Sequence, residues 1–233
     1  LRSAAANMRW KQPPPMAERL AGRLAVVTGA AAGIGQGCAR MFAAQGARVI
    51  GIDRAGADIA CDLTDESATN AAFAAIGADH GRIDVLVNAA AFAHFEWIEA
   101  MSHAQWRETL VGELDIVFLP TRAAWPWLKA SGAASVINFA SANARHALPG
   151  SAALAHCAGK GGVLAMTRQL AMEGAPHNIR ANTISPGFIL TEATRRHLDA
   201  EPALEGMVLA KNMLQRLGEP EDIAHCATWL ASN

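Results

Sequence analysis

A glycine-rich turn near the start of the chain has the composition of a phosphate-binding loop. An apolar run at 24–27 leads into Thr28-Gly29-Ala30-Ala31-Ala32-Gly33-Ile34-Gly35, and a helical pattern follows. Glycines permit a tight turn and let backbone N–H groups approach a pyrophosphate, while the N-terminus of the next helix adds unpaired donors and a positive dipole end. Such a turn by itself is also compatible with an ordinary strand-to-helix connection. Its place after the first strand of a βαβ unit, with an acidic residue after the second strand, indicates a dinucleotide site.

That acidic residue is Asp53, which ends the second apolar run 24 residues beyond Gly29. A carboxylate here accepts hydrogen bonds from the adenine-ribose hydroxyls and repels a 2′-phosphate. The alternative is a solvated turn aspartate. The positive charge of Arg54 beside it weakens the repulsion of a 2′-phosphate. The pair therefore favours NAD over NADP as the cofactor.

The elements that must position these residues alternate along the chain. Short apolar runs predict strands at 24–28, 48–53, 85–88, 135–139 and 179–184, and longer helical patterns occupy 33–45, 66–78, 102–129, 152–172 and 222–230. Continuous apolar strands separated by helices indicate a parallel sheet covered on both faces. Right-handed crossovers then give a single α/β domain with a doubly wound parallel sheet, the Rossmann fold.

Length and composition restrict the class of protein. The chain has 233 residues, 52% hydrophobic and 18% charged, with a formal net charge of −1. This balance is typical of a globular protein and indicates neither a nucleic-acid nor a membrane partner; no apolar run approaches the ~20 residues that span a bilayer. The four cysteines have neither zinc-site nor disulfide spacing, so we expect no metal, reduced thiols and a cytoplasmic location. Residues 1–20, with three consecutive prolines, are predicted to be a tail or linker, and 21–233 the NAD(P)-binding domain without its last strand.

Several motifs in this order resemble the short-chain dehydrogenase/reductase family in its single-domain form. The resemblance runs from about residue 20 to 233. Its motifs are the glycine turn, the segment Cys61-Asp62-Leu63-Thr64-Asp65, the strand end Leu86-Val87-Asn88-Ala89-Ala90-Ala91, the segments Ile179–Asn182 and Ser185-Pro186-Gly187, and the late helix entry Leu217–Ala224. The resemblance implies a cofactor site made of Gly29, Ala31, Ala32, Gly33, Ile34, Gly35, Asp53, Arg54, Asp62, Leu63, Asn88, Ala89, Ala90, Lys160, Pro186, Gly187, Ile189 and Thr191.

The family's catalytic set is Asn–Ser–Tyr–Lys, and this chain departs from it at two positions. Ser141 falls on the serine position, and Lys160 on that of the lysine, which holds the ribose. The tyrosine position carries His156, in a chain that contains no tyrosine, and the asparagine position carries Glu113. The resemblance therefore implies the catalytic residues Ser141, His156, Lys160 and Glu113.

The spacing of the substitutes suggests what they can do. His156 and Lys160 are four apart in a predicted helix, so their side chains share one face. A neighbouring ammonium favours neutral imidazole, which can accept a proton from an alcohol near pH 7. Glu113 has three alternatives: it pairs with Lys160, it accepts the N–H of the imidazole, or it faces solvent. The second alternative would give Ser141, His156 and Glu113 the logic of a hydrolytic triad, although the G-x-S-x-G elbow is missing.

We therefore expect an NAD(H)-dependent oxidoreductase that interconverts a secondary alcohol and a ketone, with a small-molecule substrate. One alternative is a lyase, dehalogenase or hydrolase that uses His156 on the same scaffold. Another is a catalytically inactive dinucleotide-binding protein. The resemblance also implies a homodimer or homotetramer that pairs through the helices at 102–129 and 152–172.

Overall fold

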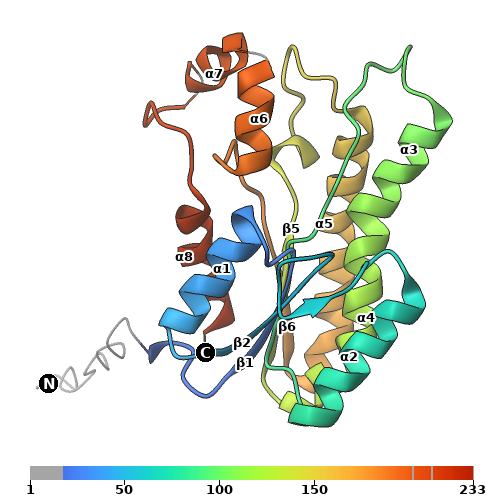
Figure 1. Cartoon of the computed structure of the whole chain (residues 1–233), viewed down its shortest axis with the longest axis vertical. Helices are drawn as coiled ribbons and strands as arrows, with labels where there is room; N and C mark the ends of the chain where they lie inside the picture. Colours follow the sequence, from blue (N-terminus) through green and yellow to red (C-terminus); the bar gives the residue numbers. More distant parts are fainter. Residues whose placement is uncertain (1–17, 201, 211, 233) are drawn as a thin grey trace, which may run out of the picture.

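A single parallel sheet forms the centre of the molecule (Figure 1). The computed structural model describes residues 18–200, 202–210 and 212–232. Its strand order, β3-β2-β1-β4-β5-β6, reverses direction between β1 and β4, as in a doubly wound sheet. Every strand pair is parallel. The strands are β1 (Leu24–Thr28), β2 (Arg48–Asp53), β3 (Ile59–Ala60), β4 (Val85–Asn88), β5 (Ala134–Phe139) and β6 (Ile179–Ile184). The predicted fold class is confirmed.

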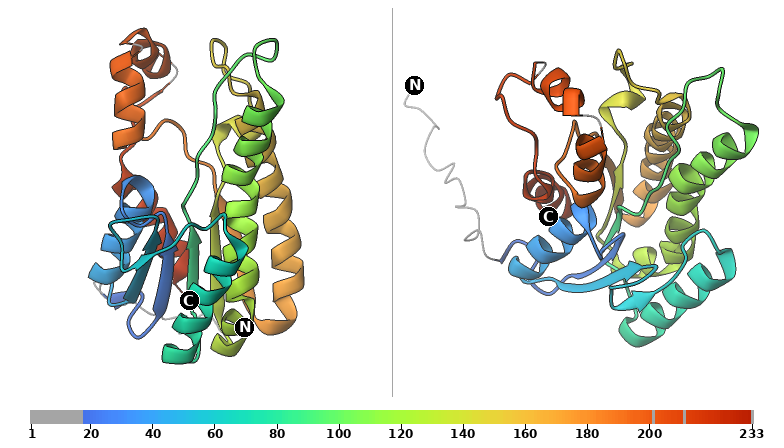
Figure 2. Two further views of the ribbon diagram at one scale, coloured as in Figure 1. Left: turned by 45° about the vertical axis from the view of Figure 1, so that its right-hand side comes forward. Right: turned by 45° about the horizontal axis from the view of Figure 1, so that its top comes forward.

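Helices cover both faces of the sheet because successive strand residues point to opposite sides. In β1, Ala25 and Val27 pack against α1 (Gly33–Ala44) and α8 (Pro220–Ala231). The alternate residues of the same strand pack against α2 (Glu66–His80), α4 (Ile116–Ser131) and α5 (Leu154–Gly174). Figure 2 shows these two helical layers on either side of the strands.

The predicted helix at 102–129 is not one regular helix. It consists of α3 (His103–Leu110), a π-helical turn over Val111–Asp115 and α4. Single π turns inside helices are rare and occur frequently at functional sites. Hydrophobic periodicity continues through the turn, which is why the sequence pattern did not reveal it. This turn carries Glu113.

Among the strands and α-helices of the described residues, three short elements were absent from the predicted pattern. They are the two-residue strand β3 and the helices α6 (Glu192–Ala200) and α7 (Pro202–Leu209). The two helices follow Thr191 and stand beyond the N-terminus of α1 (Figure 1). No helix among the described residues is both long enough and apolar enough to cross a membrane.

Residues 1–17 of the predicted tail (residues 1–20) lie outside the described residues. Its last residue, Leu20, is fully buried, and its backbone N–H donates to the Gln45 carbonyl at 2.9 Å. Leu20 therefore packs with the domain. The domain boundary at 21 and the missing last strand remain predictions.

Candidate active site and cofactor cradle

The glycine-rich loop is folded so tightly that side chains would not fit at two of its glycines. Gly29 has φ +66°, and a Cβ there would lie 2.7 Å from the Ala90 nitrogen. At Gly35 a Cβ would lie 2.1 Å from the Gly29 carbonyl oxygen. The N-cap residue of α1 is Ala32, which makes no side-chain capping hydrogen bond, and the first turn of α1 contains no acidic residue. The N–H groups of that turn are therefore left for an anion, which is the arrangement a dinucleotide pyrophosphate requires.

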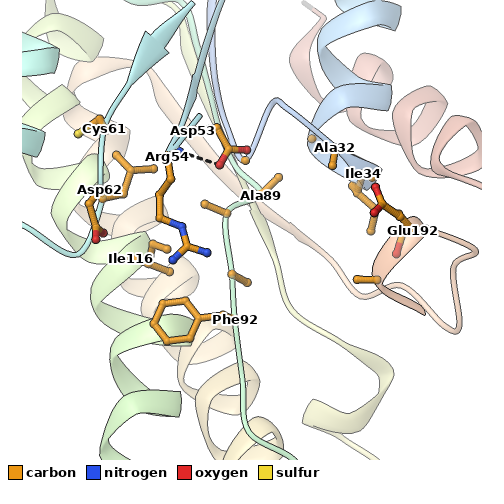
Figure 3. A pocket seen from close by; sticks show the side chains of 18 of the residues that line it. Ala32, Ile34, Asp53, Arg54, Cys61, Asp62, Ala89, Phe92, Ile116 and Glu192 are labelled. Carbon is orange, nitrogen blue, oxygen red and sulfur yellow. Dashed lines mark hydrogen bonds between the residues drawn. The ribbon is translucent and has the colours of Figure 1, made fainter. Parts of the chain in front are cut away.

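A pocket of about 340 Å³ lies beside this loop, at the carboxyl ends of the strands (Figure 3). Twelve of the residues predicted to bind cofactor line it: Gly29, Ala32, Gly33, Ile34, Gly35, Asp53, Arg54, Asp62, Leu63, Ala89, Ala90 and Thr191. Seven further residues, which were not among the predicted cofactor residues, also line it: Cys61, Ala91, Phe92, Ile116, Glu192, Ala193 and Arg196.

The other predicted cofactor residues lie elsewhere around the loop. Ala31 lines a second hollow of about 330 Å³ between α1 and the start of α8. Ile189 is buried in the core, and Pro186 accepts a hydrogen bond from the Ala142 backbone through its carbonyl. Gly187 is exposed, with nothing within 4 Å of a Cβ added there.

Asp53 is held at the end of β2 with both carboxylate oxygens engaged. Oδ2 accepts the Ala31 backbone N–H at 3.1 Å, and Oδ1 accepts the Arg54 backbone N–H at 2.7 Å. Figure 3 shows the Arg54 side chain extending across the pocket in the direction of Phe92. The Asp53 carboxylate is thus fixed beside the glycine loop.

Asp62 adds a second carboxylate to the same wall. Its Oδ1 accepts the backbone N–H of Thr64 at 3.0 Å and the hydroxyl of Thr64 at 2.7 Å. These hydrogen bonds, with the nearby Arg54 charge, hold the pKa of Asp62 below its usual value. The Asp62 carboxylate is therefore ionised at this wall of the pocket near neutral pH.

Polar side chains join the strand ends that flank the loop. The Thr28 hydroxyl accepts the backbone N–H groups of Ala89 and Ala90, at 3.1 and 3.2 Å. The Asn88 amide, which is buried, donates to Thr121 and to Asn138 at 2.9 and 2.8 Å. Asn88 thus ties β4 to β5 and α4, which fixes the backbone of Ala89 and Ala90 against the pocket.

Glu113 lies between His156 and Lys160. Its side chain is 2% exposed; Oε1 is 2.7 Å from Nδ1 of His156, and Oε2 is 2.5 Å from Nζ of Lys160. The imidazole and ammonium side chains are 15% and 8% exposed. The structure therefore realises two of the three alternatives for Glu113 together, and the solvent-facing alternative is wrong.

Glycines in α5 allow the π-helical turn to come this close. A Cβ on Gly159 would lie 2.6 Å from the Glu113 Cβ, and one on Gly162 would lie 2.7 Å from a Leu114 methyl carbon. The carbonyl of Gly112 in the same turn accepts the Phe92 backbone N–H at 3.1 Å. The turn thus packs against α5 on one side and the loop after β4 on the other.

The second ring nitrogen of His156 is directed away from Glu113, because the two nitrogens lie on different sides of the ring. The Phe95 ring packs against the imidazole with centroids 5.3 Å apart and planes inclined by 40°. Phe95 itself is 53% exposed. An aromatic side chain at the surface therefore borders the imidazole, and sequence reasoning gave it no role beside His156.

Ser141 follows β5, where its hydroxyl caps a short 3-10 turn by accepting the Asn143 backbone N–H at 3.1 Å. No hydrogen bond joins Ser141 to His156, and both residues lie in the described part of the chain. A hydrolytic triad needs that contact. The described residues also contain no group of three or more His, Cys, Asp or Glu side chains able to hold a metal ion.

The fold and these motifs have relatives of known name. A family model described as "Enoyl-(Acyl carrier protein) reductase" matches residues 29–233. The D-threitol dehydrogenase of Mycolicibacterium smegmatis is 36% identical to this chain, covering 92% of this chain and 88% of that protein. The galactitol 2-dehydrogenase (L-tagatose-forming) of Cereibacter sphaeroides is 35% identical, with 92% and 89% coverage. The chain belongs to the short-chain dehydrogenase/reductase family.

Solved structures of this family superpose closely on the chain. One, from Beutenbergia cavernae, is provisionally named an NAD(P)-dependent gluconate 5-dehydrogenase and contains NADP at low occupancy. It is 30% identical, with a TM-score of 0.84, and covers 94% of this chain and 92% of that one. The resemblance predicted from the motifs is confirmed. The alignment of Glu113 and His156 with the family's asparagine and tyrosine remains a prediction, but the two side chains are in contact.

Proposed function

We propose that this short-chain dehydrogenase/reductase is an NAD(H)-dependent enzyme that interconverts a secondary alcohol and a ketone, with His156 exchanging the proton. Family membership makes the chain an oxidoreductase of alcohols and ketones. The observation that carries the finer proposal is the His156 imidazole, held 2.7 Å from the buried Glu113 carboxylate; the motif alignment predicts that His156 takes the position of the family's proton-transfer residue. An imidazole oriented by a carboxylate is a common general acid/base in enzymes.

Each residue of the set has one task in the proposal. Ser141 donates a hydrogen bond to the substrate oxygen, and His156 takes the hydroxyl proton during oxidation or returns it during reduction. Lys160 forms an ion pair with Glu113 and keeps N–H donors for the ribose hydroxyls. The bound nicotinamide supplies the hydride acceptor or donor at the carbinol carbon.

The activity is tested by following NADH absorbance across a panel of secondary alcohols and ketones. D-threitol and galactitol belong in it because relatives are named for them. Less polar secondary alcohols belong in it because Phe92 lines the pocket and Phe95 borders His156. NADH formation with at least one alcohol supports the proposal. Binding of NAD without turnover of any panel member would count against it.

We expect Asp53→Asn to reverse part of the preference for NAD. The carboxylate is fixed at the ribose end of the pocket, and a charged hydrogen bond contributes about 1.5–3 kcal/mol, roughly ten- to hundredfold in Kd. NAD should therefore bind that much more weakly, and NADP more tightly than to the natural chain because the repulsion is gone. Titration calorimetry with both nucleotides measures this.

The matched control is Asp65→Asn, because asparagine caps a helix about as well as aspartate. Asp65 caps α2 outside the pocket lining. This variant should leave both dissociation constants unchanged. An Asp53→Asn protein with the natural ratio of NAD to NADP affinity would show that Asp53 does not select the cofactor.

We also propose that the protein is a cytoplasmic homodimer or homotetramer. Free thiols at all four cysteines suit a reducing compartment. Phe118 on α4 and Met172 on α5 are exposed apolar side chains on the helices through which the family pairs. Light scattering of the purified chain would reveal a monomer if this surface is not an interface.

A further inference from the structure

The buried Glu113 carboxylate has two neighbours, and its contact with His156 is favourable with only one placement of the imidazole hydrogen. Oε1 faces Nδ1 of His156 at 2.7 Å, and Oε2 faces the Lys160 ammonium at 2.5 Å. An ionised carboxylate accepts hydrogen bonds and donates none, so Nδ1 of His156 must carry the hydrogen. With Glu113 only 2% exposed, water cannot compete for either oxygen.

The consequence concerns the other ring nitrogen of His156. Neutral imidazole carries one hydrogen, so a hydrogen fixed on Nδ1 leaves Nε2 with a free lone pair. The partner of one histidine nitrogen decides which nitrogen is available for chemistry. Nε2 is therefore the only ring atom of neutral His156 that can accept a proton.

We infer that Glu113 is a positioning residue that holds His156 in the Nδ1–H tautomer and thereby makes Nε2 the atom that exchanges the proton. The effect on turnover rests on the proposed function; the tautomer itself does not. In the oxidation direction the substrate O–H bond breaks, an N–H bond forms at Nε2, and the imidazolium keeps its Nδ1–H directed at Glu113. The positive charge that forms on the ring faces the carboxylate, and the proton then leaves from Nε2 to water.

The packing around Glu113 fixes this geometry. The π-helical turn brings Glu113 so close to α5 that a Cβ on Gly159 would lie 2.6 Å from the Glu113 Cβ. Glycine inside a helix costs about 1 kcal/mol relative to alanine, and at this position it allows the two backbones to approach. Because His156 and Lys160 lie on the same helix as Gly159, this approach sets both distances to the carboxylate.

Glu113→Gln is the informative substitution because an amide has one acceptor and one donor end. The Lys160 ammonium attracts the carbonyl oxygen and repels the NH₂ group. The NH₂ group then faces Nδ1 of His156 and donates to it, which forces the hydrogen onto Nε2. The variant should therefore exchange the tautomer while changing neither the size nor the shape of the side chain.

The test is ¹⁵N NMR of the imidazole nitrogens in the purified full chain without substrate. The natural protein should show a protonated Nδ1 and an unprotonated Nε2 for His156, and Glu113→Gln should show the reverse. Glu108→Gln is the matched control, since Glu108 contacts His94 at 2.8 Å in an exposed pair; it should leave the His156 signals unchanged. A protonated Nε2 in the natural protein overturns the inference, even if the glutamine variant does not fold.

Kinetics on a substrate from the panel supply the second measurement. A wrong tautomer costs on the order of 10⁴ in kcat in a comparable histidine site, so we expect Glu113→Gln to lose about that much without a change in KM. Glu113→Asp keeps the charge and should recover part of the loss. Equal kcat in the natural and glutamine proteins would overturn the inference. A tautomer exchange in a protein that turns over no alcohol would instead overturn the proposed function alone.

Discussion

His156→Asn is expected to lower kcat by a factor of about 10² to 10⁴, the range that one general acid/base contributes. The asparagine side chain keeps a polar group near Glu113 but has no nitrogen that can accept and release a proton at neutral pH. NAD should bind with its natural affinity, since His156 does not line the pocket beside the glycine loop. Stopped-flow measurement of NADH formation, with calorimetry for the cofactor, separates the two effects.

His103→Gln serves as the control because His103 is an exposed residue at the start of α3. The family's own residue offers a further comparison: His156→Tyr should be slower than the natural enzyme, because a phenolate beside the Glu113 carboxylate is electrostatically disfavoured. A tyrosine variant that is faster than the natural enzyme would show that the histidine site is not adapted to the redox reaction.

Gly35→Ala is expected to abolish cofactor binding. A Cβ at this position would lie 2.1 Å from the Gly29 carbonyl oxygen, so the loop that we propose as the phosphate cradle must move. Each charged hydrogen bond from the loop to the pyrophosphate that is lost costs about 1.5–3 kcal/mol, so we expect the Kd for NAD to rise by roughly a hundredfold or more. Titration calorimetry measures the Kd, and circular dichroism shows whether the chain still folds.

Gly206→Ala is the matched control for that substitution. Gly206 lies in α7, and nothing stands within 4 Å of a Cβ added there. Alanine is also the better helix former, so affinity and folding should be unchanged. If Gly35→Ala folds and binds NAD as tightly as the natural protein, the glycine loop is not the cradle.

The sheet could be predicted from the sequence because each central strand is a continuous apolar run. All five residues of β1 are buried, and such a run between helical patterns has few alternatives. The two-residue strand β3 could not be predicted, since Ile59–Ala60 is too short to show a period. Local sequence patterns therefore predict the central strands and the helices that cover them. The short edge strand β3 depends on its pairing with β2.

The relation between Glu113 and His156 was only partly predictable. Spacing places His156 and Lys160 on one helical face, and both contact the same carboxylate. Glu113 is 43 positions earlier, where sequence spacing carries no information on contact. Its burial depends on the π-helical turn and on the missing side chain of Gly159, and neither effect appears in hydrophobic periodicity.

The central claim is that this protein moves a hydride and a proton between an alcohol and a nicotinamide cofactor. The most direct measurement uses a secondary alcohol from the panel that carries deuterium at the carbinol carbon, with NAD and mass spectrometry of the nucleotide. The account predicts one deuterium in each reduced nicotinamide formed, together with the ketone. Product formation with no deuterium in the nucleotide, or with no reduced nucleotide at all, would contradict it.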